Sequence, residues 1–268
     1  MKNSQPKLRY AHVDNTKSKN LNLLLIMKRL LSLFIVMLLA IGVMAQGKNA
    51  FVDLGLSSGT LWAACNVGAK SPEQFGDYFG WGEIVPHFYK GKWSKPLEDG
   101  YYGYVWPNYK YCNHSFKLLT KYCCHEEYGD DGFTDYRIML NPDDDAASVI
   151  MGKKWCMPTE EQWQELIDEC QWSWTDNYKN TSVAGYIVAN RHKNKVHIFL
   201  PAAGFYDRNL FHQGGITGDY WSSSLDRNNS SYARFVSFHD NNCDIVSNNR
   251  CYGISIRAVR VPGDEVSR

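Results

Sequence analysis

Residues 220–260 read YWSSSLDRNNSSYARFVSFHDNNCDIVSNNRCYGISIRAVR, and this stretch decides the fold class. Strands are expected over 220–224, 234–238 and 254–261, with alternating apolar residues in the last two, and a further strand holds Ile245. The middle of the stretch is rich in Asn, Ser, Asp, Tyr, His and Arg. Such side chains supply hydrogen-bonding groups and rings but little material for a core. The pattern therefore predicts a sheet that presents a recognition surface, and it favours binding over catalysis.

One helix is expected upstream of these strands. Thr159 is a good N-cap, and Gln162 three residues later completes a capping box. Glu160 and Glu161 fall in the first turn, where the helix dipole favours negative charge. Helical spacing then places four residues on one apolar face: Trp163, Leu166, Ile167 and Cys170. We interpret this helix as scaffold.

The remaining segments complete an α+β pattern. Residues 51–64 predict a hairpin, and the Gly-aromatic run 76–83 predicts a buried loop. Residues 84–135 indicate long loops with short strands, and 186–189 and 196–200 indicate two strands joined by a polar turn. The expected fold therefore has short antiparallel strands, one or two helices and long loops.

The N-terminus has the parts of a secretory signal peptide. Lys28 and Arg29 precede the apolar run 30–43, and small residues surround Ala45, after which we expect cleavage. The run is shorter than the roughly 20 residues of a membrane span. We therefore predict a signal peptide over residues 27–45, with a single-pass anchor as the alternative.

The signal peptide defines what lies on either side of it. Residues 1–26 are polar and unpatterned, so we interpret them as an upstream extension and Met27 as the true start. Residues 46–268 have the length of a single domain. Export predicts a secreted protein, or one at the outer surface or in the periplasm of a Gram-negative bacterium. Contact with a membrane is expected only through an uncleaved signal segment.

Eight cysteines follow the signal peptide, and an oxidising compartment predicts that some of them pair. Cys123 and Cys124 are adjacent and cannot bond to each other without strain. Cys243 and Cys251 can be chance residues or a disulfide that staples the loop between them. A metal site is the alternative for the group Cys112, Cys123, Cys124 and His125, but no CxxC repeat supports it.

Charge and acidic loops bear on partners and cofactors. The formal net charge of +1 argues against a nucleic-acid partner. The aromatic content of 14% is typical of a loop-rich fold or a binding face. Acidic loops at 130–131 and 141–145 offer oxygen ligands for Ca²⁺, but Asp143 can instead cap a short helix that begins at Ala146. We expect no cofactor, with Ca²⁺ as the alternative.

Seven motifs together resemble one family. They are VDLGLSSGTLWAACNVGA (52–69), GDYFGWGE (76–83), DDDAA (143–147), WCMPTEEQWQEL (155–166), FLPAAG (199–204), YWSSS (220–224) and GISIRAVR (253–260). In this order they resemble the Fibrobacter succinogenes major paralogous domain, found in secreted proteins of Bacteroidetes-type gut bacteria. The resemblance covers about residues 51–261 and implies a C-type-lectin-like fold, shared with formylglycine-generating enzymes. Cys156 departs from the family, which usually has Arg there.

A second resemblance, to the variable proteins of diversity-generating retroelements, concerns residues 226–252. These elements mutate template adenines, so Asn codons scatter into a defined set of residues. Phe235, Ser237 and His239 are expected to face outward, opposite Val236 and Phe238. The ligand-binding residues implied in this way are Phe235, Ser237, His239, Asn242, Asp244, Val246, Ser247, Asn248, Asn249, Cys251 and Tyr252. The alternative is a polar lectin-like loop that is not diversified.

Three functions follow from these observations. The first is a secreted, non-catalytic module that binds a protein or glycan on another cell, a phage or a host surface. The second is a structural or adhesin component of the cell envelope. The third, implied by the resemblance to formylglycine-generating enzymes, is an oxidase that uses Cys243 and Cys251. HExxH and Walker motifs do not occur, and we expect Tyr220 and Trp221 in the core rather than stacked on a sugar.

Overall fold

A computed structural model describes residues 50–94, 102–192 and 196–260, so the predicted extension and signal peptide lie outside the described residues. The predicted N-terminal hairpin is confirmed, since β1 (Phe51–Asp53) pairs antiparallel with β2 (Leu61–Ala63). The last described strand, β15 (Val259–Arg260), pairs with the other edge of β2. The first and last described strands thus share one three-stranded sheet.

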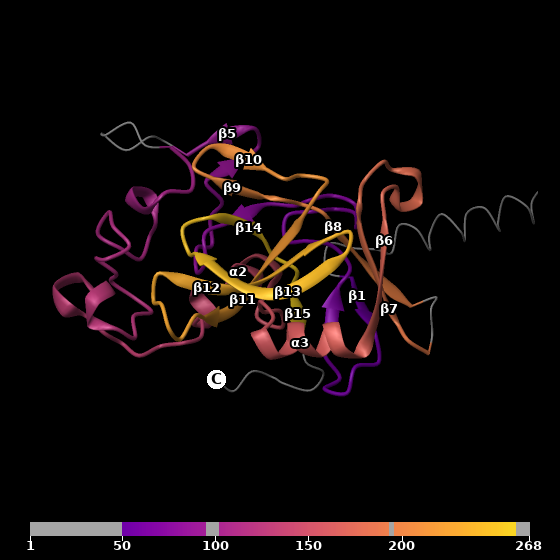
Figure 1. The fold of residues 1–268 in the computed structure, drawn as a ribbon, viewed down its shortest axis with the longest axis horizontal. Coiled ribbons are helices and arrows are strands. Elements are labelled where there is room, and N and C mark those ends of the chain that lie inside the picture. Colours follow the sequence, from indigo (N-terminus) through magenta and orange to yellow (C-terminus); the bar gives the residue numbers. More distant parts are fainter. Residues whose placement is uncertain (1–49, 95–101, 193–195, 261–268) are drawn as a thin grey trace, which may run out of the picture. The chain divides into compact units, whose positions relative to one another are not determined.

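A seven-stranded sheet forms the centre of the fold (Figure 1). Its path runs β10 (Leu210–His212), β9 (Phe205–Asp207), β14 (Gly253–Ser255), β11 (Gly218–Leu225), β12 (Tyr232–His239) and β13 (Asn242–Asn249), and β3 (Tyr78–Phe79) pairs with β14. The contact between β11 and β14 is parallel and the other pairings are antiparallel. The strands predicted around 220–224, 234–238 and Ile245 are therefore confirmed. The sheet brings both ends of the decisive stretch together.

The remaining strands form smaller sheets. The strands predicted near 186–189 and 196–200 are confirmed as β7 (Gly185–Asn190) and β8 (His197–Pro201), and β6 (Cys170–Thr175) pairs with β7. A two-stranded hairpin joins β4 (Phe88–Tyr89) to β5 (Lys92–Trp93). Single 3₁₀ turns interrupt the long loops at Trp106–Asn108, Glu126–Tyr128, Asp130–Gly132, Pro142–Asp144 and Tyr178–Asn180.

Two α-helices occur in the described residues. The predicted helix is confirmed as α3 (Glu160–Glu169), with the Thr159–Gln162 capping box formed and with Trp163 and Leu166 fully buried. The shorter α2 (Ala146–Met151) is capped by Asp145, whose side chain accepts a hydrogen bond from the Ser148 amide. The alternative use of Asp143 as the cap is therefore wrong by two residues, although a short helix does begin at Ala146. Neither helix has the length and apolar character to cross a bilayer, within the part of the chain described.

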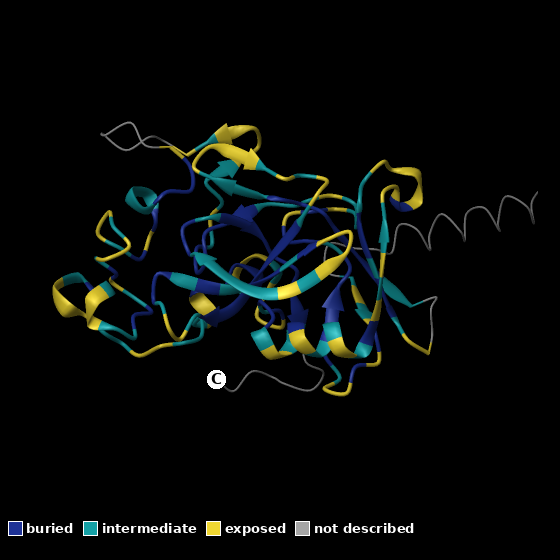
Figure 2. Cartoon of the chain, in the orientation of Figure 1, coloured by how far each residue is buried: buried dark blue, intermediate teal, exposed yellow. Residues whose placement is uncertain are grey.

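Two hydrophobic cores lie on opposite faces of β11, β12 and β13. On the α3 face, Val236 and Phe238 pack with Trp163 and Tyr220. On the other face, Trp221 packs in a second core with rings from the long loops. Tyr220 and Trp221 are fully buried, which confirms that they belong to the core. Figure 2 shows that the middle strands are mostly buried, whereas the exposed residues lie on the outer hairpins, on the loops and on one side of α3.

The closing strand differs from its prediction. Residues 254–261 were expected as one strand, but β14 ends at Ser255 and β15 begins at Val259, in a different sheet. Arg257 lies between them and is fully buried. Its guanidinium donates to the carbonyls of Ala63 (3.1 Å) and Phe199 (2.8 Å). This arginine therefore ties the crossover to two other strands, which alternation alone cannot indicate.

Candidate binding site

The antiparallel register of β12 and β13 gathers most of the predicted ligand-binding residues on one face. Phe235 lies opposite Val246, Ser237 opposite Asp244, and His239 opposite Asn242. Directly opposed residues in a sheet point to the same side. The same face therefore carries Phe235, Ser237, His239, Asn242, Asp244, Val246 and Asn248.

This face has an exposed end and a buried end. His239, Asn242 and Asp244 are exposed and Ser237 is half-buried; these four residues are called the hairpin tip face. Phe235 is only 5% exposed, and its ring meets Trp221 edge to face at 5.6 Å. The expected outward position of Phe235 is therefore wrong, because a second core covers this face below the tip. Val246 packs against the same core.

Ser247 and Asn249 lie on the opposite, α3 face of the strand. The Ser247 hydroxyl accepts a hydrogen bond from Arg234 (3.0 Å) and donates one to Asp226. Arg234 also forms an ion pair with Glu160 at the start of α3 (2.7 Å). Ser247 thus belongs to a polar link between the hairpin and the helix, and not to the hairpin tip face.

Cys251 and Tyr252 follow the end of β13. Cys251 is 3% exposed inside the second core, so its predicted role in a recognition surface is wrong for this structure. Tyr252 is half-buried and stacks on Phe205 at 5.8 Å. Neither side chain continues the hairpin tip face.

Polar contacts organise the hairpin tip face. Asn242 donates to Asp244, and Asp219 on β11 lies opposite Ser237. Asp219 is 4% exposed; burial raises its pKa, and hydrogen bonds from Ser237 and Thr217 offset part of that rise. The tip therefore rests on a fixed, hydrogen-bonded floor. Its exposed imidazole, amide and carboxylate groups can each donate or accept hydrogen bonds to a ligand.

The acidic loop that suggested Ca²⁺ is used within the fold. Asp144 accepts hydrogen bonds from Lys121 and from the hydroxyls of Tyr111 (2.5 Å) and Tyr122 (2.6 Å). Burial raises the pKa of Asp144. The hydrogen bonds from these donors and the charge of Lys121 lower the pKa by more than burial raises it, so the net pKa is lowered. The described residues contain no group of three His, Cys, Asp or Glu side chains arranged to hold a metal ion. The loop carboxylate therefore organises the surrounding aromatic residues.

The two C-terminal thiols are free and far apart. Cys243 packs near the α3-face core at the start of β13, whereas Cys251 lies in the second core beyond its end. The six residue steps from Cys243 to Asn249 alone extend about 20 Å along the strand. A disulfide requires Cα atoms within about 7 Å. The staple, one of the two alternatives for these cysteines, is therefore wrong, and so is the thiol pair on which the oxidase alternative depends.

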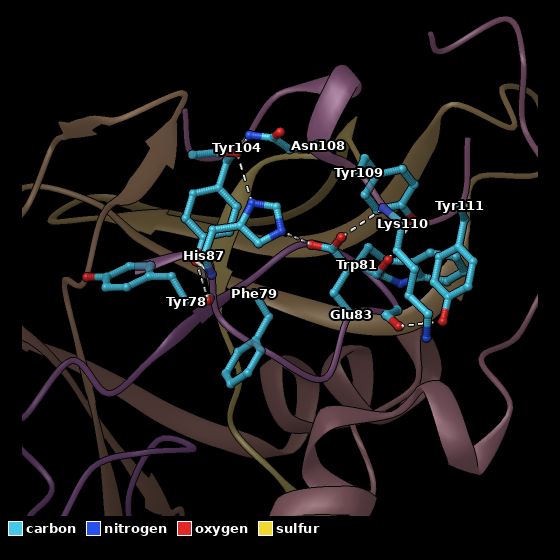
Figure 3. Close-up of polar contacts among 12 residues, drawn as sticks. Tyr78, Phe79, Trp81, Glu83, His87, Tyr104, Asn108, Tyr109, Lys110 and Tyr111 are labelled. Carbon is cyan, nitrogen blue, oxygen red and sulfur yellow. Dashed lines mark hydrogen bonds and ion pairs between the residues drawn. The ribbon is translucent and has the colours of Figure 1, made fainter. Parts of the chain in front are cut away.

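A second site lies away from the predicted residues, in a cavity of about 540 Å³. It is lined by residues 83–87, Ser94, Pro107, Asn108 and Lys110; we call it the Glu83 pocket. Figure 3 shows Glu83 and His87 pointing toward each other beside Tyr104. The sequence predicted only a buried loop here. An acidic residue at the end of a Gly-aromatic run, with a His four residues later, is the one local signal of this pocket.

His87 is held on both ring nitrogens. Nε2 lies 2.9 Å from a carboxylate oxygen of Glu83, and Nδ1 lies 2.8 Å from the carbonyl of Gly103. Burial lowers the pKa of His87, but the hydrogen bond to Glu83 and its charge raise it more, so the net pKa is raised. The ring also stacks on Tyr104 at 4.7 Å. With both nitrogens facing acceptors, the imidazolium has no free lone pair to act as a general base.

Comparisons of the chain with protein-family models, with curated proteins and with solved structures find no match. The function is therefore inferred from geometry and chemistry.

Proposed function

We propose that the protein is a secreted or surface-displayed, non-catalytic binding protein that recognises a protein or glycan through its hairpin tip face. One observation supports this most directly: the pairings of Ser237 with Asp244 and His239 with Asn242 place four polar side chains together at the turn end of a hairpin. The other end is fixed between two cores. A rigid base lowers the entropy lost on binding, while polar side chains can adapt to different partners.

We also propose that the chain is a C-type-lectin-like member of the Fibrobacter succinogenes major paralogous domain family. The helix and the closing segment that carry the resemblance both pack into the cores, through Trp163 and Val259 on one side and Ile254 on the other. Retroelement diversification is proposed for the exposed tip. Substitutions there leave both cores intact, which is the condition a repeatedly mutated protein must meet.

The test is binding of fluorescently labelled protein to a panel of bacterial and host cells. We expect some cells to bind it, and the variant S237A/H239A/N242A/D244A to lose at least about tenfold in affinity. The matched control is E161A/Q164A/D168A, which removes three exposed side chains from α3. Equal binding by both variants would exclude the hairpin tip face as the recognition surface. Concentration-dependent self-association in place of cell binding would indicate a structural component.

A further inference from the structure

We propose that the Glu83 pocket is a second binding site, which takes a neutral ligand rich in hydroxyl groups, such as one sugar residue of a glycan. The proposal does not depend on the hairpin tip face. It rests on the size of the cavity, the pairing of its charges and the hydrogen-bonding groups that remain available.

Size and composition fit a small ligand. A volume of about 540 Å³ lies within the range of about 300–1,000 Å³ typical of small-molecule sites. Ile84, Val85, Pro86 and Pro107 give the lining an apolar part. Val85 is 68% exposed, although it is a large apolar residue. Aliphatic groups of this kind can cover the C–H face of a sugar ring.

The charges in the pocket are already balanced. Glu83 is paired with His87 at 2.9 Å. Lys110 extends from the lining to Asp144, with 3.5 Å between Nζ and the carboxylate oxygen. A charged ligand would therefore find no unpaired counter-charge and would have to break an existing pair. A neutral ligand leaves both pairs intact, and burying it requires no uncompensated charge.

Several hydrogen-bonding groups remain available to hydroxyl groups. The Asn108 amide donates to the Gly103 carbonyl (2.9 Å), while its side-chain oxygen has no partner among the described residues. Glu83 is buried and already accepts from the Lys110 amide (2.9 Å) and from His87, so it holds the pocket in shape rather than contacting a ligand. The exposed ammonium group of Lys110 keeps further donors. An amide oxygen and an ammonium beside apolar residues match neighbouring hydroxyls, which both donate and accept.

The pocket is also held in shape before binding. His87 bridges Glu83 and Gly103, and its backbone amide donates to the Tyr104 hydroxyl (3.2 Å). Tyr104 in turn donates to the Tyr78 carbonyl on β3. Residues 83–87 are thus tied to the segment that carries Asn108. A preorganised site loses less conformational entropy when a ligand binds.

Saturation-transfer NMR and titration calorimetry test the proposal, with methyl glycosides of glucose, galactose, mannose and N-acetylglucosamine as neutral probes. Glucuronic acid and glucosamine serve as charged counterparts. We expect at least one neutral probe to bind below about 10 mM, more tightly than either charged probe. No binding of any neutral probe at that concentration, or tighter binding of a charged one, would overturn the assignment.

Variants locate the site. Asn108→Ala is expected to weaken binding of the best neutral probe at least about tenfold, and Lys110→Gln to weaken it less, because a polar group remains there. Asn228→Ala, in an exposed loop, is the matched control and should bind as the wild type does.

Thermal melts show whether each variant is folded. Because Lys110 is exposed, K110Q is the pocket variant whose folding should be least affected. The variant S237A/H239A/N242A/D244A should bind the sugar normally, so failure of the tip proposal and failure of the pocket proposal are distinguishable. Wild-type affinity in both pocket variants would place the sugar elsewhere.

Discussion

The two ends of the β12–β13 hairpin have similar sequence patterns but different surroundings. At the tip, His239 and Asn242 are exposed. Four residues away along each strand, on the same face of the hairpin, Phe235 and Val246 pack against Trp221 and its neighbours. Alternation in the sequence correctly assigns residues to one face or the other. It does not indicate where along the strand that face becomes covered, because the covering residues come from distant loops. Depth along the hairpin therefore separates residues that support the fold from residues free to contact a ligand.

The largest effect is expected from placing the same residue, asparagine, at the buried end and at the exposed end of this face. Phe235→Asn should lower the free energy of unfolding by at least about 3 kcal/mol, because it empties a ring-sized volume and buries an amide. His239→Asn, on the same face at the tip, should change it by no more than about 0.5 kcal/mol. Urea unfolding followed by tryptophan fluorescence measures both. Similar losses in the two variants would show that the hairpin is not divided in this way.

A smaller effect is expected from a pair of serines on neighbouring strands. Ser222 is fully buried; its hydroxyl donates to the Arg234 carbonyl (2.8 Å) and accepts from the Ser224 amide (3.1 Å). Ser222→Ala leaves both backbone groups without this partner and should cost about 1–3 kcal/mol. Ser237→Ala at the tip removes one hydrogen bond to Asp219 from a half-buried side chain and should cost less, about 0.5–1 kcal/mol. Chemical denaturation of the two variants compares them, and the reverse order would contradict the assignment of Ser237 to the exposed end.

Local signals in the sequence predicted the local parts of this fold. The capping box at Thr159, the N-terminal hairpin and the strand around Val236 depend on neighbours a few residues away, and each is confirmed. The crossover at Arg257 was missed because its partners, such as the Phe199 carbonyl, are distant in the chain. Sequence spacing likewise suggested a Cys243–Cys251 pair that the extended strand between them keeps apart.

The candidate sites show the same limit. The residues of the hairpin tip face could be named from the sequence because two adjacent strands carry them. The Glu83 pocket could not, since His87 depends on the Gly103 carbonyl and Glu83 on the Lys110 amide. Such contacts arise only when separate loops pack together, and no local pattern encodes them.

A pH dependence should distinguish the pocket from the tip. The folded-state pKa of His87 is raised above its unfolded value, so the stability that its protonation contributes is fully present below the unfolded pKa and is lost as pH rises through the folded pKa. We expect the stability difference between wild type and His87→Gln to shrink from about pH 6 to about pH 8. Asn242→Ala, at the tip, is the control: neither side chain titrates, so no such trend is expected. Unfolding curves across this range measure the differences, and a difference that grows with pH would contradict the ion pair.

The smallest effect on stability is expected from natural variation at the hairpin tip face. If the gene is diversified, sequencing its 3′ end across a bacterial population should show adenine-derived changes at the codons of Ser237, His239, Asn242 and Asp244. The codons of Phe235 and Cys251 can mutate by the same chemistry, but their buried positions should restrict the surviving proteins to apolar residues. Expressed variants that differ only at His239, Asn242 and Asp244 should unfold within about 0.5 kcal/mol of one another. Equal variation at buried and exposed codons would indicate mutation without selection for folding. An invariant 3′ end with no template copy nearby would exclude diversification and leave a fixed ligand as the partner of this face.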